Sequence, residues 1–263
     1  MAGITYSEKE LQDIFQTLKE NFKHPNEKIQ EEAALALQSY CKNYFSEPGK
    51  LSKDSFLVRE IIAIASPTTL ESNITVTRGL NMALGVLSDS LLKDPALGLS
   101  KYLLDALMLN CLPKGKESDD AENRKQAVKS LTKVVISLGI TNVNKHMLKE
   151  VFETLYKAIQ DYALDRRGDV GSWVREESMR SLTSLIQLIA NQKDFYCEIL
   201  DVMGPEPEFY ERFISALLQQ LVEKIDRVRA EAGKCLQTFF KYNAASVCMF
   251  SDKDKLSALF LQE

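Results

Sequence analysis

Residues 173–182, WVREESMRSL, hold the pattern that decides the fold of this chain. Arg175 is followed three residues later by the small side chain of Ser178 and seven residues later by Leu182. Such spacings align side chains along one face of an α-helix. The pattern returns in IQEEAALAL from Ile29, in NRKQAVKSL from Asn123 and in VRAEAGKCL from Val228. A helical segment that recurs in this way predicts a repeat protein.

The position of Arg175 recurs at intervals of about 50 residues, a period that accommodates two helices and their loops. It is occupied in turn by Gln30, Arg78, Arg124, Arg175 and Arg229, although the copy around Arg78 fits the pattern less well. Gly- and Pro-rich breaks separate about ten helical segments, and no convincing strand pattern is found. We therefore predict an all-α fold, an α-α superhelix of about five helix pairs. A single array is expected over 1–263, with approximate repeats at 6–46, 51–93, 95–140, 145–191 and 206–243.

Two helix starts carry the capping-box pattern, in which a Ser or Asp is followed three residues later by Glu. These pairs are Ser7 with Glu10 and Asp119 with Glu122. The first side chain of each pair satisfies a free amide of the first turn, and the glutamate reaches back to the cap. Both pairs are expected to begin a helix.

Composition and charge exclude several classes of function. Lys and Arg total 33 against 37 Asp and Glu, giving a net charge of −4 that is mixed along the chain. This balance disfavours a nucleic-acid surface built on phosphate contacts. No secretory signal and no apolar run of about 20 residues is present, so we expect a soluble, intracellular protein that does not insert into membranes.

Metal and catalytic motifs are also missing from the sequence. The five cysteines are widely spaced without a C-x-x-C pair, which predicts free thiols rather than a disulfide framework. The two histidines, His24 and His146, are too far apart in sequence to suggest a zinc site or a catalytic triad. No phosphate-binding loop is found. We predict a protein that is not an enzyme and that needs no cofactor.

The stretch DRRGDVGS at 165–172 is interpreted as a turn between two antiparallel helices. Gly168 and Gly171 are expected to adopt the positive φ values that other residues resist. Asp169 or Ser172 can then accept hydrogen bonds from the free amides that open the next helix. Under this interpretation the Arg-Gly-Asp tripeptide is part of the turn and not an adhesion tag.

Acidic residues precede two of the arginines in the repeat column by six positions. They are Asp169 before Arg175 and Glu223 before Arg229, and we expect these pairs to belong to a structural ladder. His24 and Ser118 occupy the same place in the first and third repeats. The ladder is therefore expected to be incomplete there.

Three residues around the turn are candidates for partner contact. Trp173 is interpreted as a packing wedge between repeats, with an exposed binding hot spot as the alternative. Arg166 and Arg167 could be anchors for an acidic partner surface or part of a solvated loop, and the sequence leaves both open.

The whole pattern, V-R-x-x-A-x-x-x-L with an acidic residue six positions before the arginine, resembles the HEAT repeat. Longer stretches resemble the tubulin-folding cofactor D family. They are DYALDRRGDVGSWVREESMRSL from Asp161, EKIDRVRAEAG from Glu223, TRGLNMALGVL from Thr77 and ENRKQAVKSLTKVVISLGI from Glu122. The core RGDVGSWVRE is the specific part, whereas residues 1–60 and 240–263 match only as generic helices. Since this family's proteins are far longer, the chain resembles an excised segment of their solenoid or a truncated product.

This resemblance implies a chaperone scaffold that binds β-tubulin and works with cofactors C and E and an Arf-like small GTPase. Such an assembly builds and recycles αβ-tubulin heterodimers in the cytoplasm, in association with the cytoskeleton, and uses tubulin GTP hydrolysis as its switch. The alternative is an unrelated HEAT-repeat adaptor, such as a nuclear-transport or phosphatase scaffold.

Overall fold

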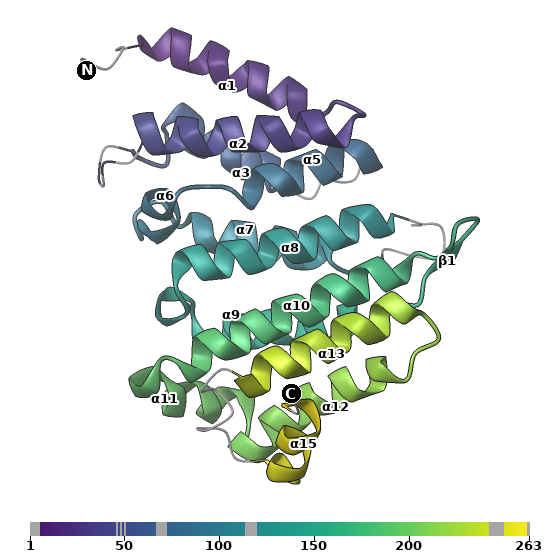
Figure 1. Ribbon diagram of the computed structural model, residues 1–263. Helices are drawn as coiled ribbons and strands as arrows, with labels where there is room; N and C mark the ends of the chain where they lie inside the picture. Colours follow the sequence, from purple (N-terminus) through teal and green to yellow (C-terminus); the bar gives the residue numbers. More distant parts are fainter. Residues whose placement is uncertain are drawn as a thin grey trace.

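The computed structural model describes residues 6–45, 47, 49, 51–66, 73–113, 120–241 and 250–261. Within these residues the regular structure is helical apart from one short hairpin, and five helix pairs stack in chain order (Figure 1). The first helices of the pairs are α1 (Glu8–Phe22), α3 (Phe56–Ile64), α7 (Leu99–Asn110), α9 (Lys145–Ala158) and α12 (Glu206–Leu221). The second helices are α2 (Glu27–Tyr44), α5 (Ile74–Leu84), α8 (Ala121–Leu138), α10 (Gly171–Ala190) and α13 (Asp226–Lys241). The predicted α-α superhelix is confirmed.

Further elements lie in the connections between these helices and after the last pair. They are α6 (Asp89–Lys93), η1 (Ile140–Asn142), the strands β1 (Leu164–Asp165) and β2 (Gly168–Asp169), α11 (Lys193–Met203) and α15 (Lys253–Phe260). Helix α15 packs against α13 at the C-terminal end of the stack. No helix in the described ranges combines the length and the apolar character that a bilayer crossing requires.

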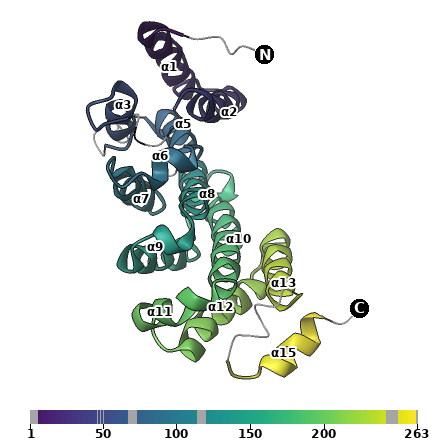
Figure 2. The ribbon, with the colours of Figure 1, turned by 90° about the vertical axis from the view of Figure 1, so that its left-hand side faces the viewer.

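The helices form two layers, which Figure 2 shows side by side. Each second helix packs against the next, so that α2, α5, α8, α10 and α13 make one continuous row. The first helices lie behind this row and make fewer contacts with one another. The second helices therefore carry most of the packing between repeats, and their other side is a long exposed face, which we call the second-helix face.

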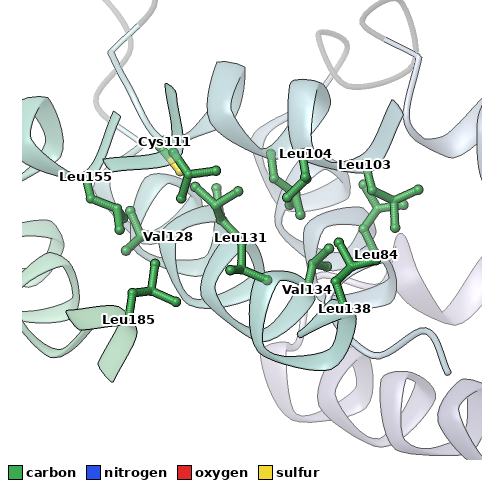
Figure 3. Close-up of a cluster of buried hydrophobic side chains, with 14 of the residues drawn as sticks. Leu84, Leu103, Leu104, Cys111, Val128, Leu131, Val134, Leu138, Leu155 and Leu185 are labelled. Atoms are coloured by element: carbon green, nitrogen blue, oxygen red, sulfur yellow. The ribbon is translucent and has the colours of Figure 1, made fainter. Parts of the chain in front are cut away.

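The core is continuous from one repeat to the next because each second helix buries residues on several sides. Val128 and Leu131 of α8 lie among side chains from α7, α9 and α10, including Leu155 and Leu185 (Figure 3). The small and leucine positions of the repeat column are all buried: Ala33, Ala127, Ser178, Ala232, Leu37, Leu131, Leu182 and Leu236. A residue of larger volume at the small positions would force neighbouring helices apart.

One predicted cap is confirmed and the other was placed one residue too early. Ser7 and Glu10 form a complete capping box at the start of α1. At the start of α8 the cap is Asp120, whose side chain accepts a hydrogen bond from the amide of Asn123. Asp119 lies outside the described residues.

Three of the five cysteines, Cys41, Cys111 and Cys235, are buried with free thiols, as predicted. Burial raises the pKa of the Cys41 thiol to about 12 and that of Cys235 to about 11. Protonated thiols of this kind pack as small apolar groups and react slowly. Cys248 lies outside the described residues, and Cys197 is described only as part of the α11 backbone.

Candidate functional site

A line of buried polar contacts joins the repeats near the start of the second helices. The side chain of Gln30 in α2 donates to the backbone carbonyls of Phe22 and Thr75, both at 2.8 Å. Arg78 in α5 donates from Nε to Gln30 Oε1 at 2.9 Å and from Nη1 to Glu122 at 3.3 Å. Gln30 therefore binds its own repeat and the second repeat, and Arg78 binds the repeats on both sides of its own.

Arg124 and Asp161 form the next link of this line. The guanidinium of Arg124 donates to both oxygens of the Asp161 carboxylate, at 2.6 and 3.2 Å. Both side chains are only 3% exposed, so each charge depends on the other for its stabilisation. The backbone carbonyl of Asp161 also accepts a bond from Nη1 of Arg175 at 2.7 Å. Asp161 thus connects the arginines of the third and fourth repeats.

The expectation that the ladder is interrupted in the third repeat was wrong. Ser118 lies outside the described residues, but Arg124 obtains its carboxylate from Asp161, in the loop after α9. The two residues are 37 positions apart, so a rule based on a six-residue spacing could not find the pair. Asp161 is the main structural residue that the sequence analysis missed.

Arg175 lies at the centre of the fourth repeat with a fully buried side chain. Its Nη2 donates to Asp169 Oδ2 at 2.9 Å, and its Nε donates to Gln220 Oε1 of α12 at 3.1 Å. The guanidinium also lies over the ring of Tyr162, 4.2 Å from the centroid. Charged hydrogen bonds and a cation–π contact together compensate the loss of hydration.

Asp169 stabilises the start of α10 as well as Arg175. Its Oδ1 accepts a bond from the amide of Ser172 at 3.0 Å, which satisfies one of the free amides of the first turn. The hydroxyl of Ser172 instead donates to the backbone carbonyl of Asp169, at 2.5 Å. Of the two residues proposed to cap this helix, Asp169 is the one whose side chain accepts a hydrogen bond from a helix amide.

The corresponding pair in the last repeat has a different geometry. Arg229 donates from Nη1 to the backbone carbonyls of Glu223 and Lys224, at 2.7 and 2.9 Å, and from Nη2 to the carboxylate of Asp226. The carboxylate of Glu223 accepts a bond from the Tyr162 hydroxyl at 2.6 Å. Glu223 and Arg229 therefore lie close together without a carboxylate–guanidinium pair.

The Arg-Gly-Asp tripeptide lies in a β-hairpin between α9 and α10, an element that the sequence analysis did not predict. Strands β1 and β2 pair antiparallel, with Asp165 opposite Gly168. Gly168 has the expected positive φ of 103°. Gly171 does not, and it is required for another reason: a Cβ atom there would lie 2.3 Å from the Asp161 carbonyl oxygen. The close approach of two backbone segments excludes a larger residue.

The three candidate contact residues have different surroundings. Arg167 donates to Glu122 of α8 at 2.7 Å, and its guanidinium lies 4.9 Å from the centroid of the Trp173 ring. Trp173 is partly buried against the core, and Arg227 of α13 also lies over its ring, at 5.9 Å. Arg166, at the tip of the hairpin, is exposed and forms no ion pair with any described residue. Arg166 is thus the more accessible of the two arginines.

Ion pairs continue from this hairpin across α10 and α13. Arg180 of α10 pairs with Glu177 at 2.8 Å and with Glu231 of α13 at 2.9 Å. Arg227 pairs with Glu176 at 3.0 Å and contacts the Ser172 hydroxyl. These contacts hold the last two second helices in register.

Charged side chains from four second helices surround a hollow of about 400 Å³ on the second-helix face. We call it the charged hollow, and it is lined by Glu27, Glu31, Glu122, Lys125, Gln126, Lys129, Trp173, Glu176, Arg180 and Arg227. Exposed groups of both signs beside a single large aromatic ring are typical of the polar part of a protein interface. In the described part of the chain, no cluster of three or more His, Cys, Asp or Glu side chains could hold a metal ion.

Comparisons with known proteins agree with the resemblance found in the sequence. Residues 211–263 match the family model described as tubulin folding cofactor D C terminal. Tubulin-specific chaperone D of Dictyostelium discoideum is 26% identical to this chain over 275 aligned residues, which cover 94% of the chain. Tubulin-folding cofactor D of Schizosaccharomyces pombe is 29% identical over 90 residues, or 34% of the chain. The expected similarity to tubulin-folding cofactor D is confirmed.

The matched ranges correct one expectation about the C-terminal residues, and they cover only a small part of each relative. Residues 240–263, which were expected to match only as generic helices, lie inside the matched family model. The alignment with the Dictyostelium relative covers 18% of that protein's length. The alignment with the fission-yeast relative covers 7% of that protein's length.

Proposed function

We propose that this chain is a non-enzymatic chaperone scaffold that acts on tubulin, because it is similar to tubulin-specific chaperone D of Dictyostelium discoideum along 94% of its length. This similarity is the observation that carries the proposal. The fold is compatible with it, since stacked helix pairs present a long face over which many weak contacts can be spread. The bonds between repeats, such as Arg124 with Asp161, stiffen that face and reduce the entropy lost on binding.

The proposed partners are β-tubulin, tubulin-folding cofactors C and E and an Arf-like small GTPase. In this proposal the chain contributes to the assembly and recycling of αβ-tubulin in the cytoplasm, with GTP hydrolysis taking place on tubulin. The names of the two relatives, a tubulin-specific chaperone and a tubulin-folding cofactor, support the tubulin part of this proposal. The other partners follow from the family resemblance alone.

We also propose a division of roles among the predicted site residues. Gly168, Asp169, Gly171 and Arg175 maintain the shape of the turn, as their short backbone and side-chain contacts suggest. Glu223 and Arg229, which the sequence pattern places at the corresponding positions, have the same role in the last repeat. Arg166, Arg167 and Trp173 are the proposed contacts for an acidic partner surface, and the five helix pairs form one HEAT array over 1–263.

A capture experiment tests the function directly. The immobilised chain is incubated with β-tubulin and, in parallel, with a panel of phosphatase subunits and nuclear-transport factors. We expect it to retain tubulin and none of the panel proteins. Retention of a panel protein without tubulin would support the HEAT-adaptor alternative and refute the proposal.

A further inference from the structure

A second depression lies on the second-helix face beside the charged hollow, above α5. It encloses about 250 Å³ and shares Glu31, Gln126 and Lys129 with the charged hollow. The two depressions therefore adjoin each other, and we call the one above α5 the α5 groove. Helix α5 has 11 residues, whereas α2 and α8, on either side of it, have 18 each.

The groove exists because α5 is recessed between its longer neighbours. Eight consecutive residues of α5, from 77 to 84, are buried. Gly79 makes this possible, since a Cβ atom there would lie 1.9 Å from the backbone carbonyl oxygen of Phe22. The side chains of Met82 and Val86 form part of an apolar floor, and Leu35 of α2 lies beside them with 55% of its surface exposed.

One edge of the groove carries a row of lysines. Lys125, Lys129 and Lys133 follow one another at four-residue spacing along α8, which brings their side chains to the same helix face about 6 Å apart. All three are exposed and none forms an ion pair with a described residue. Burial, and after it the charge of Lys129, lowers the pKa of Lys133, and the carboxylates of Glu177 and Glu31 offset part of this shift.

The opposite edge belongs to α2 and carries carboxylates. Glu31 and Glu32 line the groove there, and neither pairs with the lysines of α8 within the 4.0 Å that defines an ion pair in the described residues. An apolar floor between a basic edge and an acidic edge is the arrangement that receives an amphipathic helix. Apolar side chains of such a helix cover Leu35, its acidic flank faces α8 and its basic flank faces α2.

We propose that the α5 groove binds an amphipathic helix of a partner protein that carries a row of carboxylates along one flank. This site goes beyond the proposed tubulin function, because it is defined by the chemistry of the depression over α5, which none of Arg166, Arg167 and Trp173 lines; Trp173 lines the adjoining charged hollow. The partner chemistry follows from the unpaired lysine row and the exposed Leu35.

Two synthetic helical peptides of about four turns test this proposal. Both carry a leucine stripe with lysines on one flank; on the other flank the acidic probe has glutamates and the basic probe has lysines. We expect the wild-type chain to bind the acidic probe about tenfold more tightly than the basic one, with a preference that weakens as salt is added. Equal binding of the two probes would overturn the proposal, as would binding of duplex DNA as tight as that of the acidic probe.

Charge reversal of the lysine row gives the sharper result. The variant K125E/K129E/K133E is expected to prefer the basic probe. The control K9E/K101E/K157E, which changes the net charge equally at exposed lysines outside the groove, is expected to keep the wild-type preference. Retention of the acidic preference by the groove variant refutes the site. If that variant unfolds, K125Q/K129Q/K133Q replaces it and is expected to lose the preference.

Leu35→Ser separates the apolar contribution from the charges. Because Leu35 is exposed, we expect unchanged thermal stability and severalfold weaker binding of the acidic probe; unchanged binding would overturn the helix-in-groove arrangement. Tubulin capture is measured on the same variants. Binding of the acidic probe without tubulin capture would uphold the groove and refute the proposed function, and the reverse result would refute the groove alone.

Discussion

Asp169→Ala tests whether the hairpin is a structural device or a contact site. In the structure Asp169 accepts one bond from the Ser172 amide and bonds from two nitrogens of Arg175. Loss of the amide partner alone costs about 1 kcal/mol. Removal of one partner of a buried ion pair costs about 3–5 kcal/mol. Here that cost is smaller, since Arg175 keeps the Asp161 carbonyl and Gln220.

We therefore expect Asp169→Ala to lower the free energy of unfolding by about 2–3 kcal/mol. For a chain of this size that corresponds to a fall in melting temperature of roughly 7 °C. Asp169→Asn keeps an acceptor for the amide and loses only the charge, so it should fall between Asp169→Ala and wild type. Arg166→Ala is the control: it removes an exposed side chain and should change the stability by less than about 0.5 kcal/mol.

Thermal unfolding followed by circular dichroism measures these differences, alongside tubulin capture for each variant. A melting curve of Asp169→Ala equal to that of wild type would refute the structural reasoning. If Asp169→Ala melted like wild type and no longer captured tubulin, the loop would be a contact site. Loss of capture by Arg166→Ala at unchanged stability would instead support a contact at the hairpin tip.

Three further changes probe the links between repeats and the cap of α8. Asp161→Ala should lower the free energy of unfolding by about 3 kcal/mol, because it removes the carboxylate that Arg124 binds. The double variant Arg124→Met/Asp161→Leu, which leaves no unpaired charge, should recover much of that stability, and denaturant unfolding measures both. Gly171→Ala should lower the melting temperature by several degrees, since its Cβ would lie 2.3 Å from a backbone oxygen; an unchanged melt would contradict the close approach. Burial raises the pKa of Asp120 to about 6, so the folded chain holds this proton more tightly than the unfolded chain does, and stability falls as the pH rises from about 4 to about 6. Asp120→Asn should therefore be about 1 kcal/mol more stable than wild type near pH 7 and equal to it near pH 4, and the opposite pH trend would refute the burial argument.

Helix α10 and the loop before it differ in how much of their structure nearby residues in the sequence predict. The spacing of Ser178 and Leu182 from Arg175 was enough to predict a helix and its buried face, because both depend on residues within two turns. The capping box at Ser7 was found for the same reason. The cap at Asp120 was misplaced by one residue, since two adjacent aspartates offer the same local signal.

Contacts between repeats depend on how the helices stack. The bond from Arg124 to Asp161 crosses 37 residues, and no spacing in a single sequence indicates which of many carboxylates will be buried beside an arginine. The same holds for Gly171, whose lack of a side chain matters because the Asp161 carbonyl passes close to it. A hairpin of two-residue strands is also too short to give an alternating pattern.

The sequence by itself determined the repeat, the helix pairs and the residues that each helix buries, since these follow from the 3.6-residue period and the order of side chains along one helix. Only the tertiary structure decided the partners of the buried charges and the recess of α5 that opens the groove. These depend on the distances between helices, and such distances are set by the combined packing of side chains that lie far apart in the chain.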